Sequence, residues 1–271
     1  MDTTKFFSRL DEAFPGDPRS TDPVHPRWAH LAEEIPGSTA INALAVLNLA
    51  AQLMPVAECY VEVGTRRGRS LAAATQDVGD KRFYGLDSFG HAGHRGLDAR
   101  AELDRTLSRY AAHADTRVVE GDAFRTLARR GVVDRPVGVY FYDGPTTGLA
   151  HHLALAVIEP HLADEALVFV ADSSRPKVQQ VHGDFLAGHR GWSLAARWDG
   201  HGIEDNRWGN GLHALVYRRP AGSTKRLSAA DERRRRVQVG LRGPLASATR
   251  RVAHKVPPIV SAPRRPVAPL S

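Results

Sequence analysis

The sequence predicts an α/β fold: a Rossmann-like, doubly wound sheet that is mostly parallel and ends in an antiparallel hairpin at its C-terminal edge. Three observations predict it. Short apolar runs alternate with segments of helical character through residues 59–172, and this alternation is typical of a parallel sheet. The first run leads directly into a glycine turn and a helix. Each run also bears an acidic residue, either within it or at its carboxyl end.

The elements follow in chain order from the apolar runs and the turn residues between them. A helix over Ser38–Met54 precedes the first strand, Cys59–Val63. Four further parallel strands are expected at Arg82–Leu86, Thr116–Glu120, Val137–Tyr142 and Ala166–Ala171. The helices between the strands are expected at Leu71–Thr75, Leu97–His113, Ala123–Arg130 and Leu149–Leu162.

The last part of the predicted domain has a different pattern. A helix is expected from Ser174, a residue type that caps helix N-termini, with Pro176 in its first turn. Trp192–Trp198 and Gly211–Arg218 alternate or run apolar, and no clear helix separates them. These two segments are therefore expected to pair as an antiparallel hairpin at the sheet edge.

Composition divides the chain into three parts. Residues 1–37 are polar and contain five prolines, so they are expected to form an irregular arm with a short helix around 4–14. Residues 38–219 carry the periodic elements and form the predicted domain. Residues 220–271 are rich in proline and arginine and can bury little apolar surface, so they are expected to be disordered.

The formal net charge of +7 is concentrated in the C-terminal tail. Residues 220–271 hold 12 Lys and Arg against 2 Asp and Glu, a net charge of +10. The other 219 residues therefore hold 25 against 28, a net charge of −3. The domain itself gives no reason to expect nucleic acid as a partner. The tail is expected to be solvated, and contact with an anionic membrane or partner is the alternative.

Cysteine usage and hydropathy limit the classes of protein to which this chain could belong. A single cysteine, Cys59, excludes an internal disulfide framework and a cysteine-rich metal site. The first forty residues lack a basic start followed by an apolar core, so no secretory signal is expected. The most apolar stretch, Thr39–Met54, is too short to span a bilayer. We therefore expect a cytoplasmic protein without a transmembrane segment, and the sequence is compatible with a homo-oligomer.

The most informative segment is Tyr60–Ser70, where a short β-branched strand passes through Glu62 into a turn between Gly64 and Gly68. Glycines allow close approaches that a Cβ would block, and the helix after the turn presents unpaired N–H groups. A dinucleotide-binding turn reads G-x-G-x-x-G, whereas Arg66 stands at the middle glycine here. The acidic strand residue suits a cationic ligand such as S-adenosylmethionine, which has no phosphate. An ordinary strand–turn–helix is the alternative.

Acidic residues recur on the expected parallel strands: Glu62, Asp87, Asp122, Asp143 and Asp172. The carboxyl ends of such strands share one edge, where ligands bind in open α/β sheets. Carboxylates gathered there repel one another unless a cationic ligand or metal lies among them. Asp87 is expected to accept hydrogen bonds from ribose hydroxyls and Asp122 one from an adenine amino group. A plain turn and a helix cap are their structural alternatives.

Five segments together resemble a class I S-adenosylmethionine-dependent methyltransferase of the family 24 type over roughly residues 40–218. They are Val61–Ser70, Phe83–Phe89, Val119–Phe124, Val139–Gly144 and Val168–Asp172. The resemblance implies a sheet of about seven strands, S-adenosylmethionine as methyl donor, and O-methylation of a small molecule or sugar. The expected cofactor-binding residues are Glu62, Gly64, Thr65, Gly68, Ser70, Asp87, Ser88, Asp122 and Asp143.

The sequence departs from this family's pattern after the fourth and fifth strands. The family usually continues Asp-Gly-Asp-His, but here Asp143 is followed by Gly-Pro-Thr, so Thr146 replaces a histidine that could serve as base or metal ligand. The family's fifth strand ends in Asp-Asp or Asp-Asn, but here Asp172 is followed by Ser173. Asp143 and Asp172 are the expected ligands if Mg²⁺ is bound, although a third strong ligand is missing.

A hydroxyl acceptor needs help in losing its proton, and the expected catalytic residues are Asp143, His91 and His94. His151 and His152 are further candidates, but any one of thirteen histidines more often has a structural or solvent-facing role. The loop of residues 199–211 is a candidate acceptor pocket, with a plain hairpin connection as the alternative.

The sequence thus favours methylation of a small hydroxylated acceptor, a sugar or a natural-product intermediate. Loss of the usual histidine at Thr146 motivates one alternative, a protein of this fold that binds a cofactor or partner but does not catalyse. A nicotinamide-dependent oxidoreductase is the other alternative, and the glycine spacing disfavours it.

Overall fold

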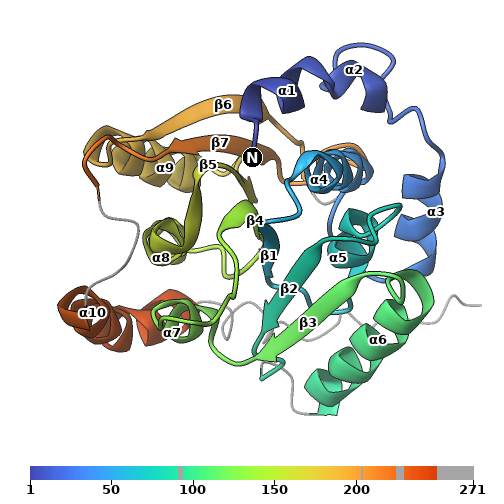
Figure 1. The fold of residues 1–271 in the computed structure, drawn as a ribbon. Helices are drawn as coiled ribbons and strands as arrows, with labels where there is room; N and C mark the ends of the chain where they lie inside the picture. Colours follow the sequence, from blue (N-terminus) through green and yellow to red (C-terminus); the bar gives the residue numbers. More distant parts are fainter. Residues whose placement is uncertain (91–93, 203, 224–228, 249–271) are drawn as a thin grey trace, which may run out of the picture.

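Seven strands form one sheet in the order β3-β2-β1-β4-β5-β7-β6, with helices on both faces (Figure 1). The protein is represented by a computed structural model, which describes the chain except for residues 91–93, 203, 224–228 and 249–271. The strands are β1 (Cys59–Val63), β2 (Arg82–Asp87), β3 (Asp115–Glu120), β4 (Val137–Tyr142), β5 (Leu162–Ala171), β6 (Trp192–Trp198) and β7 (Leu212–Arg218).

The pairing confirms the predicted doubly wound sheet. Strand β1 pairs in parallel with both β2 and β4, and β3 and β5 extend the parallel sheet outward. Strand β7 is antiparallel to β5 and to β6, which makes the predicted hairpin at the edge. Strand order reverses between β1 and β4, and in such sheets this reversal opens a crevice outside the carboxyl ends of the strands.

Each face of the sheet is covered by its own cluster of buried apolar side chains. One face carries α1 (Thr3–Ser8), α2 (Leu10–Ala13), α3 (Arg27–Glu34), α4 (Ile41–Leu53), α5 (Arg69–Ala74) and α6 (His94–Tyr110). The other carries α7 (Ala123–Leu127), α8 (Gly148–Ile158), the 3₁₀ helix η1 (Glu159–His161), α9 (Pro176–Gly188) and α10 (Ala229–Ala248) (Figure 1).

Helix α4 is the apolar segment that precedes the first strand, and it is buried along most of its length. Its polar amides bond to main-chain carbonyls: the Asn42 side chain donates to Pro18 and Thr21, and the Asn48 side chain donates to Ala73 and Gln76. Within the described part of the chain, no helix is long and apolar enough to cross a membrane.

The N-terminal segment differs from the irregular arm that its composition predicted. Phe6, Phe14, Trp28 and Ile35 are buried in the same apolar cluster as α4. Their side chains are spaced irregularly among prolines and charged residues, so neither helical nor strand periodicity reveals them. The division at residue 37 stays a prediction, but the segment before it contributes to the core.

Several element boundaries and part of the tail also differ from expectation. Helix α9 begins at Pro176 with Arg175, not Ser174, at its N-cap. Strand β5 begins at Leu162, where the helix was expected to continue, because α8 ends at Ile158. In the tail, residues 229–248 form α10, whose Val239 is buried against the second apolar cluster. Residues 249–271, also predicted to be disordered, lie outside the described residues.

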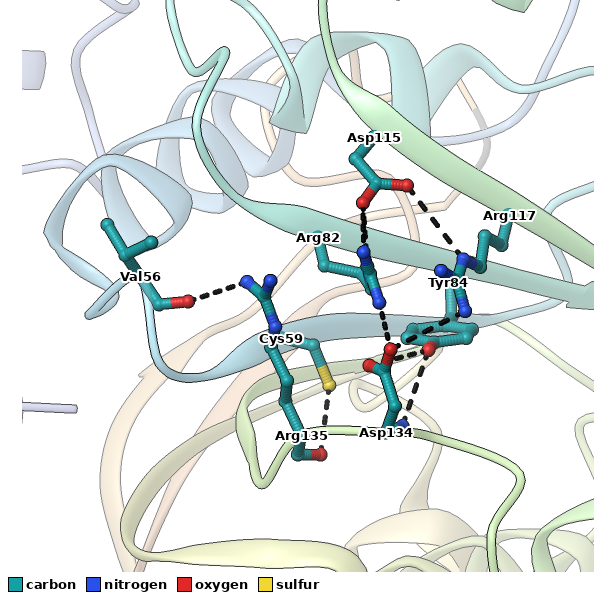
Figure 2. A network of polar contacts seen from close by, with 8 residues as sticks. All are labelled: Val56, Cys59, Arg82, Tyr84, Asp115, Arg117, Asp134 and Arg135. Atoms are coloured by element: carbon teal, nitrogen blue, oxygen red, sulfur yellow. Dashed lines mark hydrogen bonds and ion pairs between the residues drawn. The ribbon is translucent and has the colours of Figure 1, made fainter.

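A polar network joins the amino ends of the central strands (Figure 2). The Arg82 guanidinium forms ion pairs with both Asp115 and Asp134, and the Tyr84 hydroxyl donates to Asp134 over 2.9 Å. Nearby, the Cys59 thiol donates to the Arg135 carbonyl, and burial raises the pKa of this thiol to about 12. The lone cysteine is therefore a packed thiol rather than a nucleophile, because a thiol with so high a pKa stays protonated.

Three buried histidines meet between α8, α9 and β7. The His182 and His213 rings approach through their Nδ1 atoms at 2.9 Å, and the His151 and His182 ring centroids lie 5.3 Å apart. Burial lowers the pKa of His151 and of His182 to about 3 and that of His213 to about 4. The charges of Arg175, near His151, and of Arg197, near His213, lower these pKa values further, whereas Asp199 opposes the shift at His213.

This cluster predicts that acid destabilises the fold. The unfolded chain would protonate these histidines near pH 6.5, whereas the folded chain holds them neutral to much lower pH. Their contribution to stability is therefore complete above pH 6.5 and is lost as the pH falls toward 3. Each excluded proton is worth about 1.4 kcal/mol per pH unit. We expect the melting temperature to fall progressively between pH 7.5 and pH 5.

The variant His151→Phe removes one of the three titrating groups and should flatten this pH dependence. Neither ring nitrogen of His151 hydrogen-bonds to a described residue, so the substitution breaks no such bond. The matched control is His30→Phe at an exposed position, which should leave the slope unchanged. An equal slope in both variants would show that acid acts through other groups.

Candidate functional site

The carboxyl ends of β1 and β4 approach each other more closely than any side chain would permit. Gly64, directly after β1, has a φ of +91°, and a Cβ built on it would lie 2.0 Å from the carbonyl oxygen of Asp143. The approach is held by the Asp143 N–H, which donates to the Val63 carbonyl at 2.9 Å. A glycine is therefore required at this position, and it brings Asp143 against the turn.

The turn itself fixes the carboxylate at the end of β2. Arg66 adopts a left-handed φ of +48°, and its N–H donates to Oδ2 of Asp87 over 2.9 Å. The other oxygen, Oδ1, accepts from the Phe89 N–H at 2.9 Å, and Phe89 is itself left-handed at +46°. The Asp87 carboxylate is thus oriented by two main-chain N–H donors, one from the glycine turn and one from Phe89. We call the edge of the sheet formed by the carboxyl ends of the parallel strands and the turns after them the rim.

Glu62 lies inside the sheet beneath this turn and is fully buried. Its carboxylate accepts from the Ser70 hydroxyl at 2.9 Å and from the Tyr60 hydroxyl at 3.1 Å. The pKa of Glu62 is raised to about 8, mainly by burial and to a smaller extent by the charge of Asp143, while hydrogen bonds from the Ser70 and Tyr60 hydroxyls oppose the rise. A positive charge above the turn would stabilise the ionised form of this buried acid.

Three of the other predicted cofactor residues lie in this turn or next to Asp87. Gly68 has a φ of +87° at the N-cap of α5, where a Cβ would lie 2.7 Å from the Leu103 side chain. Thr65 is buried with its side chain against β2, since a Cβ on Gly85 would lie 2.9 Å from its Oγ1. Ser88 follows Asp87 and is half-buried.

Asp122 has the role that was its structural alternative. It is the N-cap of α7, and its Oδ1 accepts from the Arg125 N–H at 3.0 Å. The residue stays partly exposed at the carboxyl end of β3, next to the neighbouring strand that ends in Asp87. Helix capping and a ligand contact are compatible here, because a carboxylate has more acceptor sites than one N–H occupies.

A cavity of about 40 Å³ opens between the ends of β4 and β5. Both Asp143 and Asp172 line it. Asp172 has a φ of +57°, and its Oδ1 accepts from the side-chain amide of Asn210 at 2.8 Å. The remaining lining residues, most of which the sequence did not reveal, are Ser38, Thr39, Ala40, Ala43, Phe141, Ala171, Trp208, Asn210, Gly211 and Leu212.

The donor set of this cavity does not match a complete metal site. No group of three or more His, Cys, Asp or Glu side chains in the described part of the chain could hold a metal ion. The Arg175 guanidinium lies 3.5 Å from Asp172 and supplies positive charge where a cation would sit. The Mg²⁺ hypothesis for Asp143 and Asp172 therefore gains no support from the geometry and stays a prediction.

The candidate bases fall into two groups. His91 and the side chain of His94 lie outside the described residues, so their catalytic role stays a prediction. His151 is buried in the histidine cluster, with the Tyr142 ring edge-on to it at 5.2 Å. The segment that replaces the family's histidine is an irregular loop: the Tyr142 hydroxyl donates to the Pro145 carbonyl at 2.8 Å, and Thr147 caps α8.

Several residues around the rim are structural. The Arg69 guanidinium donates to the carbonyls of Ala32, Ile35 and Thr39, which ties the N-terminal segment to the start of α5. Trp208 stacks on Trp198 with ring centroids 4.9 Å apart, and its indole N–H donates to the Pro18 carbonyl. Both residues therefore hold segments in place beside the cavity, and sequence periodicity gave no signal for either contact.

Part of the chain matches a known family model. Residues 61–173 match the family model described as a methyltransferase domain. This match confirms the resemblance drawn from the sequence, and the matched range includes the glycine turn, Asp87, Asp122, Asp143 and Asp172. No curated protein sequence matches the chain.

Solved structures with a similar fold have low sequence identity to this chain. An O-methyltransferase from Bacillus cereus in complex with S-adenosylhomocysteine is 13% identical, with a TM-score of 0.54 over 72% of this chain and 92% of that one. A methyltransferase from Podospora anserina bound to S-adenosylhomocysteine is 13% identical, with a TM-score of 0.52 over 81% and 95%. An O-methyltransferase from Streptomyces achromogenes, in complex with S-adenosylmethionine and involved in tomaymycin synthesis, is 15% identical, with a TM-score of 0.51 over 81% and 100%.

The close approach at Gly64 predicts a large effect of Gly64→Ala. The variant combines a left-handed backbone with a Cβ placed against the Asp143 carbonyl, so β1 and β4 must separate locally. The matched control is Gly131→Ala, which has a φ of +73° but nothing within 4 Å of the new Cβ. The control should lose only the left-handed penalty of about 1–2 kcal/mol, and Gly64→Ala should lose more than about 3 kcal/mol. Urea unfolding of both variants measures the difference, and equal losses would contradict the steric argument.

Proposed function

We propose that this chain is an S-adenosylmethionine-dependent methyltransferase that transfers the methyl group to a hydroxyl oxygen of a small molecule. The observation that carries the proposal is the Asp87 carboxylate, oriented by the Arg66 N–H beside the glycine turn. The turn lacks the middle glycine of a dinucleotide-binding turn, and a pyrophosphate there would oppose the ionisation of the buried Glu62, whereas the cationic methionyl end of S-adenosylmethionine would favour it. The bound ligands named for the structures of similar fold agree with this choice.

Each rim residue has a role that follows from its contacts. Asp87 would accept hydrogen bonds from the ribose hydroxyls through acceptor sites that the Arg66 and Phe89 N–H groups leave open. Asp122 would accept from the adenine amino group while it caps α7. Glu62, Ser70 and the Gly64–Gly68 turn would hold the methionyl end, and Glu62 would become ionised as the positive charge arrives.

When bound, S-adenosylmethionine supplies a methyl group that is already activated by its sulfonium, so the protein contributes mainly by positioning. The cavity beside Asp143 and Asp172 is where the acceptor hydroxyl would enter. Asp143 lies on both the glycine turn and this cavity, so it is the residue placed to take the hydroxyl proton. The small-molecule acceptor, a sugar or natural-product intermediate in this proposal, would extend outward from it.

A second candidate is a cofactor-binding protein of this fold that does not catalyse. Among the described residues that line the cavity there is no histidine, and the segment that usually carries one is a loop whose Pro145 carbonyl accepts from the Tyr142 hydroxyl. In this alternative the rim binds S-adenosylmethionine and no acceptor is methylated.

Asp87→Ala tests the cofactor assignment. The variant removes a carboxylate that would bond two ribose hydroxyls, each such charge-assisted bond contributing about 1.5–3 kcal/mol. We expect affinity for S-adenosylmethionine and S-adenosylhomocysteine to fall at least about tenfold in calorimetric titration. The matched control is Asp80→Ala, which removes an exposed acid before β2 and should leave affinity unchanged. Wild-type protein that binds neither ligand, or an Asp87 variant of normal affinity, would refute the assignment.

Asp143→Asn separates catalysis from binding. The amide keeps the shape of the side chain but cannot accept the proton, so turnover should fall about 100-fold or more while S-adenosylhomocysteine still binds. Methyl transfer from radiolabelled S-adenosylmethionine to a panel of sugars, phenols and other hydroxylated compounds provides the measurement. Cofactor binding by the wild type without transfer to any of these compounds would favour the non-catalytic candidate. Full activity in the variant would show that another group takes the proton.

A further inference from the structure

The outer face of α10 carries a stripe of exposed apolar side chains. Val237, Leu241 and Leu245 follow at intervals of four residues, so they lie along one side of the helix. Their exposed fractions are 57%, 72% and 67%. The other exposed large apolar side chains among the described residues are Val24, Val56 and Leu194, which lie in separate parts of the chain. Scattered exposed side chains are ordinary, but a contiguous stripe marks an interaction surface.

The opposite face of α10 is already used for packing. Val239 is 2% exposed within the apolar cluster that includes side chains of α8, and the Arg235 guanidinium donates to the Ala156 carbonyl at 2.7 Å. Helix α10 lies at the outside of the molecule next to α7 and α8, away from β6 and β7 (Figure 1). The helix is therefore anchored to the domain by one apolar face while a second apolar face points outward.

Exposed arginines border the stripe. Arg233 precedes Val237 by four residues and so continues the line of the stripe in the preceding turn, with Arg234 beside it. Arg242 follows Leu241 and lies beside the stripe further along the helix; all three arginines are exposed. An apolar stripe bordered by basic side chains is typical of helices that lie in the interface of a bilayer.

We propose that the outer face of α10 binds the surface of an anionic lipid bilayer. Val237, Leu241 and Leu245 enter the boundary between headgroups and acyl chains, while the arginines pair with lipid phosphate and carboxylate groups. Two other occupants fit less well. In a dimer formed through this face, arginine rows from two copies would meet with like charge. A nucleic acid would neutralise the arginines but leave the apolar stripe in water.

This proposal is independent of methyl transfer, because α10 does not contribute to the glycine turn or the cavity. It also assigns to α10 the membrane contact that the sequence raised as an alternative for the whole basic tail. The charge of residues 220–271 supplies long-range attraction, and the exposed face of α10 supplies the contact that holds the protein at the surface.

The test is flotation of the full chain with vesicles of phosphatidylcholine, with or without phosphatidylserine. We expect binding only where phosphatidylserine is present, and weaker binding as salt is raised. Leu241→Ser should lower apparent affinity about tenfold or more, since a leucine side chain is no longer buried. Arg234→Ser should lower it about fivefold, which corresponds to about 1 kcal/mol for one basic residue near an anionic surface.

Matched controls are Leu194→Ser on β6 and Arg190→Ser, both at exposed positions away from α10, and neither should change binding. Melting temperatures establish that the variants are folded, and Val237→Ser provides a second substitution in the stripe. Equal binding to both kinds of vesicle, binding to neither, or α10 variants that bind like wild type would overturn the proposal. A dimer in sedimentation that becomes a monomer in Leu241→Ser, together with wild-type protein that does not bind the vesicles, would also overturn the proposal.

Discussion

The contact between Gly64 and the Asp143 carbonyl is the constraint on which the rest of the site depends. Because there is no room for a Cβ between them, the turn after β1 and the end of β4 form one surface rather than two loops with a gap. Arg66 then projects its N–H toward Asp87, which couples β2 to the same surface. Three strand ends are thereby held in a fixed relation, and the position of Asp143 at the cavity follows from it.

Residues at the rim have strained backbone conformations as well as acidic side chains. Three of the four non-glycine residues with positive φ in the described chain, Arg66, Phe89 and Asp172, lie at this edge of the sheet. Left-handed backbone costs such residues about 1–3 kcal/mol each, and it persists only where surrounding contacts impose it. At Arg66 and Phe89 the compensating contact is the hydrogen bond that orients Asp87. The strained backbone is thus part of what orients the Asp87 carboxylate.

The sequence predicted the parts of this arrangement that periodicity and turn chemistry encode. The strands are nearly as expected because their apolar runs are short and bounded by Gly, Pro and Asp, and strand ends fix which acids share an edge. It could not predict that Arg69 binds three carbonyls of the N-terminal segment, or that Phe6 and Trp208 belong to the core. These contacts join residues far apart in the chain, and an isolated aromatic or arginine has no period to reveal its partner.

Carboxylates at the two ends of the sheet have different partners, and this difference favours a cationic ligand at the carboxyl ends of the strands. At the amino ends of the strands, Asp115 and Asp134 are neutralised by Arg82 and Arg117 (Figure 2). At the carboxyl ends, Asp87 and Asp122 are held by main-chain N–H groups and Glu62 by two hydroxyls, donors that orient a charge without cancelling it. Burial raises the pKa of Glu62 to about 8. The acids at the amino ends are thus paired with arginine, whereas at the carboxyl ends Arg175 pairs with Asp172 but Asp87 and Asp122 are held by neutral donors, so a cation bound beside Asp87 and Asp122 would stabilise their charge.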